Sequence, residues 1–240
     1  MALSTSDRIV VVGGTSGIGL AVAQAAAAAG PQVIIGSRSE QSVQQALGDL
    51  PEGARGLQVD VTSPGSLAAF FTEIGPFDHL VYTAGDALVR GVIADYDPLQ
   101  AQKFFDIRLF RALDTVRSAL PTLNPSGSVT LTSGAAAFRG GAGKLLGTTV
   151  SAAVNAAAVS LAVELAPIRV NVVAPGVVRT PLWAGMPEEA REGLFTMAGG
   201  GTLLGRVADA EDVARAYVSL MDQDYVTGNV AVLDGGSILK

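Results

Sequence analysis

The chain has 240 residues, of which 49% are apolar and 16% charged, and it contains no cysteine. This length and apolar share fit one large domain with a substantial core. The missing cysteines exclude a disulfide framework and a thiolate zinc site, and no metal site is expected. The formal net charge of −6 repels phosphate polymers, so neither a nucleic acid nor an anionic membrane is an expected partner.

The amino-terminal residues and the longest apolar runs bear on location. Residues 1–8 include polar and charged side chains before the first apolar run, which does not resemble a secretory signal peptide. No apolar run reaches the roughly 18 residues that a membrane-spanning helix needs. The sequence therefore predicts a cytoplasmic protein without a membrane partner.

Short apolar runs rich in β-branched residues alternate with longer stretches rich in Ala and Leu. Such alternation predicts an α/β fold with a doubly wound, seven-stranded parallel sheet that carries helices on both faces. No linker or repeat divides the chain, so we expect a single domain over residues 1–240. The expected strands are 9–12, 32–35, 56–59, 79–82, 128–131, 169–173 and 230–233. The expected helices are 17–29, 67–74, 99–120, 148–166 and 210–221.

Residues 181–206 form the one long stretch without a clear helix or strand signal. The stretch combines apolar side chains such as Trp183, Phe195 and Met197 with three glycines at 199–201. A glycine-hinged segment with apolar side chains predicts a substrate lid, and a plain surface excursion is the alternative.

The first expected strand runs into a glycine-rich turn that opens a helix. Gly13 permits the tight turn, Gly17 lets the backbone approach a pyrophosphate, and Gly19 lets the helix pack closely on the sheet. Phosphate oxygens would meet free amides at the positive end of the helix dipole. This context favours dinucleotide binding over a purely structural turn. The other residues of the turn expected at the cofactor are Thr15, Ser16 and Ile18.

The end of the second strand indicates which dinucleotide binds. An NAD site places a carboxylate there, about 20 residues after the glycines, to accept from the ribose 2′-hydroxyl. This chain has Ser37 and Arg38 instead, and a hydroxyl beside a guanidinium suits a 2′-phosphate. The sequence therefore favours NADP(H) over NAD(H). The alternative is that Arg38 is a solvated residue at a helix entry.

Motifs spread over nearly the whole chain resemble the short-chain dehydrogenase/reductase family. The family's Thr-Gly-x-x-x-Gly-x-Gly motif has Val12 in place of the Thr, and residues 169–180 resemble its Arg-Val-Asn…Pro-Gly…Thr motif. The resemblance implies a Rossmann-type fold, a nicotinamide cofactor, a small-molecule substrate and a homodimer or homotetramer. It also places at the cofactor Asp60, Val61, Ala84, Gly85, Pro175, Gly176, Val178 and Thr180.

The catalytic positions depart from the family pattern. By the same resemblance, the family's Asn, Ser and Tyr-x-x-x-Lys fall on Arg108, Ser133, Gly147 and Ser151. General acid catalysis contributes about 10²–10⁴ in rate, so ordinary ketone reduction is expected to be slow without the Tyr. We expect Ser133 to bind a substrate atom and Arg108 to swing its cation into the space left by the Tyr and Lys. The alternatives are a Ser133 that satisfies a turn and an Arg108 on a helix surface.

Three other polar residues at the fourth strand have structural interpretations. His79, the only histidine, is expected to be a packed strand residue rather than a base. Tyr82 is expected to give structural support rather than a proton. Asp86 is expected either near the ribose or in a turn.

Three functions remain open at this point. The first is an NADP(H)-dependent oxidoreductase that reduces an imine or iminium, an activated alkene or a carbonyl of a small molecule. The second is a catalytically inactive homologue that binds the cofactor or pairs with an active relative in a hetero-oligomer, using small residues at 152–158 for close helix contact. The third is a non-redox cyclase or lyase with Arg108 as an electrostatic anchor.

Overall fold

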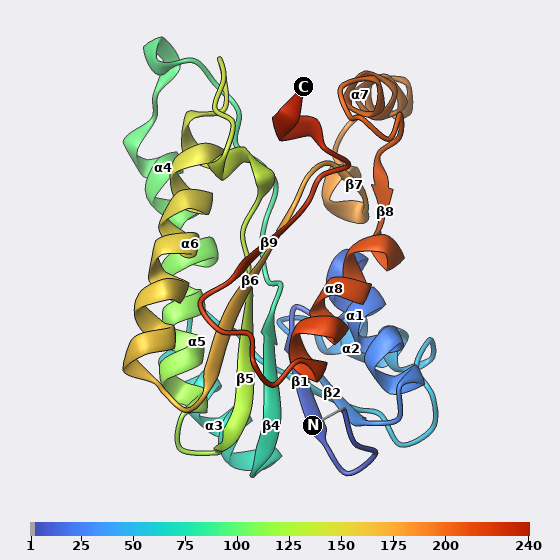
Figure 1. Ribbon diagram of the computed structural model, residues 1–240, viewed down its shortest axis with the longest axis vertical. Helices are drawn as coiled ribbons and strands as arrows, with labels where there is room; N and C mark the ends of the chain where they lie inside the picture. The colour runs from blue at the N-terminus through green and yellow to red at the C-terminus, as the bar shows by residue number, and fades with distance from the viewer. Residues whose placement is uncertain (1–2) are drawn as a thin grey trace.

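The protein is built around one parallel sheet, shown by a computed structural model that describes residues 3–240 (Figure 1). The sheet strands are β1 (Arg8–Val12), β2 (Gln32–Ser37), β3 (Arg55–Gln58), β4 (Phe77–Tyr82), β5 (Leu123–Thr132), β6 (Arg169–Pro175) and β9 (Val230–Leu233). Their order is β3-β2-β1-β4-β5-β6-β9, and every neighbouring pair is parallel. The order reverses between β1 and β4, and ligands of such sheets bind at that switch point. The predicted seven-stranded α/β fold is confirmed.

Helices cover both faces of the sheet. They are α1 (Gly17–Ala28), α2 (Glu40–Leu47), α3 (Pro64–Ile74), α4 (Pro98–Phe105), α5 (Arg111–Ala119), α6 (Leu145–Glu164), α7 (Glu188–Gly200) and α8 (Ala210–Asp222). Figure 1 shows α1, α2 and α8 on one side, and α3 to α6 on the other. Helix α2 was not predicted, because its eight residues bury only Val43 and Ala46 and so carry a weak periodic signal.

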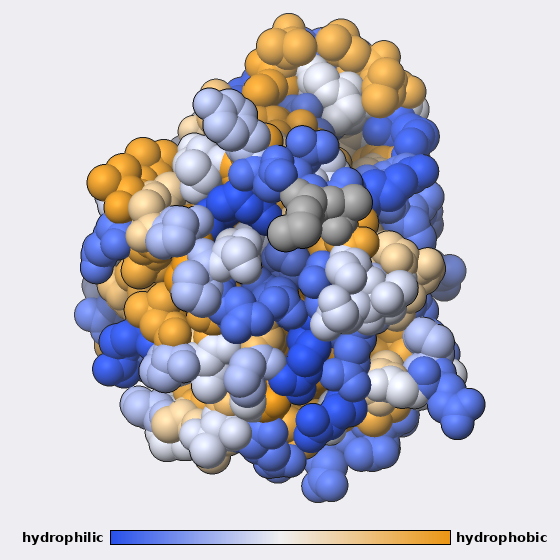
Figure 2. All heavy atoms as spheres, turned by 60° about the horizontal axis from the view of Figure 1, so that its bottom comes forward, coloured by the Kyte–Doolittle hydropathy of each residue, from blue (hydrophilic) through white to orange (hydrophobic). Residues whose placement is uncertain are grey.

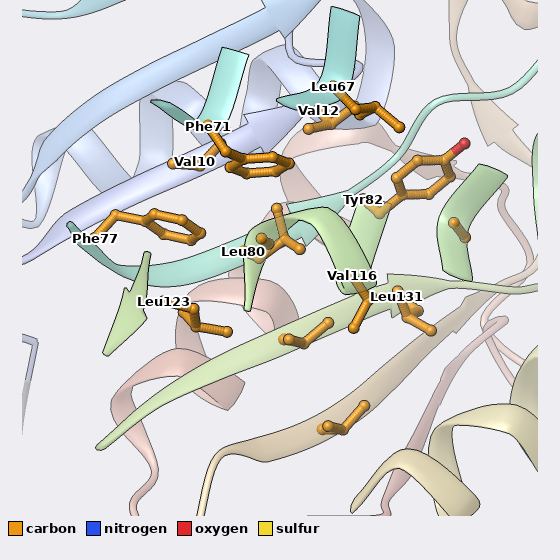
Figure 3. Close-up of a cluster of buried hydrophobic side chains, with 14 of the residues drawn as sticks. Val10, Val12, Leu67, Phe71, Phe77, Leu80, Tyr82, Val116, Leu123 and Leu131 are labelled. Atoms are coloured by element: carbon orange, nitrogen blue, oxygen red, sulfur yellow. The ribbon is translucent and has the colours of Figure 1, made fainter. Parts of the chain in front are cut away.

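Two apolar clusters form the core, one on each face of the sheet. Successive residues of β1 alternate between them: Val10 and Val12 belong to one cluster, and Ile9 and Val11 to the other. Figure 3 shows the first cluster, where the rings of Phe71 and Phe77 stack with centroids 5.7 Å apart. Because both faces are buried, the strands read as continuous apolar runs.

The predicted helix over 99–120 is interrupted. Helix α4 passes into a π-helical segment, η2 (Asp106–Phe110), before α5 begins. A π-helical turn contains one more residue than an α-helical turn, which periodicity alone did not reveal.

The expectation of an irregular stretch at 181–206 is wrong. A 3-10 turn, η4 (Pro181–Trp183), leads into helix α7, and a small parallel pair, β7 (Val178–Arg179) with β8 (Ala208–Asp209), closes the base of the excursion. The apolar side chains of α7 pack on Trp183 in a small cluster separate from the sheet. The three glycines near the end of α7 obscured its helical signal.

Helix α6 is 20 residues long and has the length and composition of a membrane span, with a mean hydropathy of 1.6 over 18 of its residues. The expectation that no apolar run reaches about 18 residues is not contradicted, because polar residues interrupt the helix. The helix includes Ser151 and Asn155, and it packs on β6 as one of the layer helices. Core helices of folded domains meet the same criterion. Its outward face leaves Val159 and Val163 exposed.

The amino ends of the strands form the lower face of the molecule. Figure 2 brings this face forward and shows hydrophilic residues gathered toward its middle. Beneath this surface, His79 is 6% exposed, and its Nδ1 shares a hydrogen bond of 2.8 Å with Ser128 Oγ. Its Nε2 lies 4.0 Å from the Asp7 carboxylate. The prediction of a packed strand histidine is confirmed.

This environment predicts that stability depends on pH through His79. Burial, opposed by Asp7, lowers the pKa of His79 from 6.5 to about 4. Between these values the unfolded chain binds a proton that the native protein does not, so stability falls as the pH drops through this window. We expect His79 to make the free energy of unfolding about 2 kcal/mol lower at pH 5 than at pH 7. Urea unfolding at both pH values should show a smaller loss in a His79→Gln variant, and an equal loss would contradict the assignment.

Candidate cofactor site and catalytic cleft

A cleft of about 1450 Å³ opens at the carboxyl ends of the strands. Sites for one small ligand occupy about 300–1,000 Å³, so this cleft has room for a dinucleotide and a second molecule. The structure brings all sixteen residues expected at the cofactor to this cleft, together with Ser133 and Arg108. They come from the ends of β1, β2, β4, β5 and β6, from the start of α1, from the turn after β3 and from the segment that leads into α7, and Arg108 comes from η2.

The turn after β1 is shaped to receive phosphate groups. Gly13 has φ +88°, and a Cβ there would lie 2.6 Å from the backbone nitrogen of Ala84. A Cβ at Gly19 would lie 2.1 Å from the Gly13 carbonyl oxygen, so only glycine fits either position. Ser16, the residue before α1, makes no side-chain cap, which leaves the first amides of the helix for an anion. This geometry fits the pyrophosphate of a dinucleotide.

The end of β2 presents the groups expected for a 2′-phosphate. The Thr15 hydroxyl donates to Ser37 Oγ over 3.1 Å, and the backbone carbonyl of Arg38 accepts from Gln58 Nε2 over 2.9 Å. The Arg38 side chain is exposed beside the cleft. The nearby Asp60 accepts hydrogen bonds from the hydroxyl and the amide of Thr62, and these lower its pKa.

Arg108 lies in the π-helical segment and is not a surface residue, because its side chain is only 15% exposed. Its guanidinium carbon lies 4.4 Å from the ring centroid of Phe104, and Nη1 lies 3.2 Å from Asp86 Oδ1. Burial lowers the pKa of Arg108, and Asp86 opposes this shift. The guanidinium does not fill the space at Gly147, since nothing lies within 4 Å of a Cβ built there. The expected swing of the cation is therefore corrected: Asp86 holds it beside Gly85.

Tyr82 supports the π-helical segment. Its hydroxyl donates to the carbonyl oxygen of Ile107 over 2.6 Å. Figure 3 shows the hydroxyl oxygen of Tyr82 pointing away from the apolar cluster. The hydrogen bond ties the end of β4 to the π-helical segment. Burial raises the pKa of Tyr82, so the phenol remains protonated as a donor. The expectation of structural support fits this contact.

Ser133 brings a polar atom into the cleft without a protein partner. Its Oγ is buried and makes no hydrogen bond within residues 3–240. A buried hydroxyl without a partner costs free energy, so a ligand that bonds to it would gain affinity. Gly147 and Ser151, one turn apart on α6, line the same cleft.

The sequence did not identify several residues of the cleft wall. Apolar side chains from the loop after β4 and from the excursion around α7 lie there, and the Arg90 guanidinium carbon lies 5.6 Å from the ring centroid of Trp183. The apolar residues in that loop were a weak signal, but only the fold brings them to the site. The additional wall residues include Leu88, Arg90, Leu194, Leu204 and Ile238.

Comparison with known proteins agrees with this architecture. A family model described as enoyl-(acyl carrier protein) reductase matches residues 12–237. The short-chain dehydrogenase/reductase ucsE of Acremonium sp. is 35% identical over 266 residues, with both chains covered completely. The chain belongs to the short-chain dehydrogenase/reductase family, whose members are oxidoreductases that bind nicotinamide cofactors.

Two solved structures are similar in fold and in sequence. One is a small-chain dehydrogenase in complex with NADPH, with a TM-score of 0.83, 30% identity, and 98% of this chain and 100% of that chain covered. The other is the MalC reductase/Diels-Alderase of Malbranchea aurantiaca, with a TM-score of 0.90, 28% identity, and 98% and 97% covered.

The Tyr82 contact predicts a measurable loss of stability. Tyr82→Phe removes the hydroxyl and leaves the partly buried Ile107 carbonyl without this donor, which should cost about 1–3 kcal/mol of unfolding free energy in urea denaturation. Tyr225→Phe is the matched control, because Tyr225 is 98% exposed. Its effect should stay within about 0.5 kcal/mol. Equal stability of the two variants would refute the supporting role of Tyr82.

Proposed function

We propose that the protein is an NADP(H)-dependent reductase that works without the family's Tyr-x-x-x-Lys pair. The observation that carries this proposal is the single cleft in which the phosphate-binding turn, the unpartnered Ser133 hydroxyl and the open space at Gly147 occur together. The cofactor site has the expected residues, but the position of the family's catalytic Tyr has no phenol to donate a proton. This combination favours a substrate that accepts hydride without a proton from the protein.

The cofactor would be NADP(H) in preference to NAD(H). Gly13 and Gly17 would hold the pyrophosphate with the first amides of α1, and Ser37 and Arg38 would bind the 2′-phosphate. When bound, the cofactor supplies hydride to the substrate. The protein's own residues would then position the electrophile.

An iminium ion meets the chemical requirement directly. Hydride adds to the iminium carbon, the C=N π pair moves to nitrogen, and a neutral amine forms without any proton transfer. The ion pair of Arg108 with Asp86 leaves that part of the cleft with little net charge, so a cationic substrate is not repelled there.

A conjugated alkene or carbonyl is the other substrate class that the site accommodates. Hydride adds to the electrophilic carbon of the alkene and the π electrons move to the carbonyl oxygen, which Ser133 Oγ would stabilise by donating a hydrogen bond. Water then protonates the enolate.

A non-redox cyclisation is the second candidate function. It is favoured by the similarity to MalC, whose name as a reductase/Diels-Alderase joins both activities in one protein. The apolar walls of the cleft suit the folding of a flexible substrate, and segment 181–206 would close over it as a lid. The third candidate function is that of an inactive homologue that binds only the cofactor or a partner subunit.

We infer a homodimer or homotetramer through helix α6. Ala152, Ala156, Val159 and Val163 are exposed along one face of this helix, and small residues let helices approach closely. A hetero-oligomer with an active homologue would use the same face. The cytoplasmic location remains a prediction.

Arg38→Ala tests the cofactor assignment. Loss of the guanidinium should weaken NADPH binding by about tenfold or more, since charge-assisted hydrogen bonds contribute about 1.5–3 kcal/mol each. NADH binding should change little, because NADH carries no 2′-phosphate. Calorimetric titration with both cofactors measures the ratio of the affinities for NADPH and NADH. Absence of heat with either cofactor in the unaltered protein would remove the reductase proposal.

Deuterium transfer tests the reductase activity. The substrates are N-methyl-3,4-dihydroisoquinolinium, 2-cyclohexenone and cyclohexanone, each with NADPH deuterated at C4 of the nicotinamide. We expect stereospecific transfer to the iminium or the enone, and at least about 100-fold slower reduction of the ketone. Ser133→Ala should slow the enone reaction and spare the iminium reaction, because only the enone develops an oxyanion.

Two outcomes would count against this scheme. Ketone reduction as fast as iminium reduction would show that a proton donor is present after all. Cofactor binding without transfer to any of the three substrates would favour the non-redox or inactive alternatives.

A further inference from the structure

Gly147 is a glycine that neither the backbone nor the packing requires. It lies in the first turn of α6, and its φ is not in the left-handed region. Nothing lies within 4 Å of a Cβ built on it, in contrast to Gly13 and Gly19, where a Cβ would meet backbone atoms. Glycine lowers helix stability relative to alanine, so Gly147 destabilises α6 although no steric or backbone requirement calls for a glycine there.

The space in front of Gly147 belongs to the cleft. Gly140 and Gly143 line the cleft just before α6, between and beside the side chains of Arg139 and Lys144, which line it as well. A Cβ at Gly143 would also meet nothing within 4 Å, and one at Gly140 would only touch Thr148 Oγ1 at 4.0 Å. The wall at Gly140, Gly143 and Gly147 therefore leaves open space beside the backbone, which we call the recess.

The excursion around α7 provides large apolar side chains on the other side. Figure 1 shows the beginning of α6 and helix α7 on opposite sides of the upper end of the molecule. Trp183, Met197 and Leu204 come from that excursion and line the same cleft. Ser133, which also lines the cleft, adds a buried hydroxyl without a protein partner.

We propose that Gly147 is a specificity-determining residue, and that the recess admits a bulky, largely apolar ring system with one hydrogen-bonding group. Such a ring system would lie over Gly140, Gly143 and Gly147 and contact the apolar side chains of residues 181–206. Its polar group would reach Ser133. A small ring of six atoms would leave the recess unfilled and gain little from it. This inference rests on the proposed function and specifies its substrate class.

The single tryptophan allows the inference to be tested by binding alone. Trp183 is the only Trp in the chain and lines the cleft, so its fluorescence reports ligands there. The probes are progesterone, a bulky tetracyclic enone, and 2-cyclohexenone, each titrated in the presence of NADP⁺. We expect progesterone to bind more tightly than 2-cyclohexenone. Gly147→Ala should weaken progesterone binding by about tenfold or more and change 2-cyclohexenone binding by less than about twofold.

Gly65→Ala is the matched control. Gly65 also lies in the first turn of a helix, α3, has nothing within 4 Å of its built Cβ, and does not line the cleft. Both alanine variants should raise the melting temperature by about 1–4 °C, because each replaces an unconstrained helical glycine. Only Gly147→Ala should change progesterone binding.

The outcomes separate this inference from the proposed function. No change in Trp183 fluorescence with progesterone, or equal progesterone binding in both alanine variants, would overturn the inference. Selective loss of progesterone binding in Gly147→Ala would support it even if no hydride transfer occurs, in which case only the reductase proposal fails.

Discussion

The close approach of the β1 turn to the end of β4 is the constraint on which the site depends. Gly13 lies so near the backbone of Ala84 that no Cβ fits between them, and Thr83 Oγ1 donates to the Gly13 carbonyl oxygen over 3.2 Å. This contact joins the two strands at the switch point of the sheet. It fixes the start of α1, and with it the amides that would receive an anion in the proposed cofactor site.

A second structural feature, the π-helical segment, forms the part of the cleft wall around Arg108. The π-helical segment between α4 and α5 carries Arg108 into the cleft, and Tyr82 satisfies a carbonyl in the same segment. Asp86 and the ring of Phe104 then hold the guanidinium. The cation is thus part of a packed arrangement that β4 and the interrupted helix share. Its charge is balanced locally and does not extend to the recess at Gly147.

The sequence predicted which residues lie at the cleft where a residue type meets one local steric or chemical requirement. The glycines of the β1 turn, the Ser37–Arg38 pair and the Pro175–Gly176 turn were all found from local spacing or motif resemblance, and they meet in one cleft. Prediction from the sequence failed where several elements cooperate. The expected swing of Arg108 toward α6 ignored Asp86, because residues 22 apart in the chain give no local sign of pairing.

The sequence by itself determined the parallel sheet, its strand positions and the phosphate-binding turn, since these follow from hydrophobic periodicity and from the steric demands of glycine. Only the tertiary structure decided the form of the 181–206 excursion and the open recess at Gly147. The stability of α7 comes from a small satellite cluster, and the recess is defined by what neighbouring elements leave empty. Space of this kind is a property of the assembled chain, and no single segment encodes it.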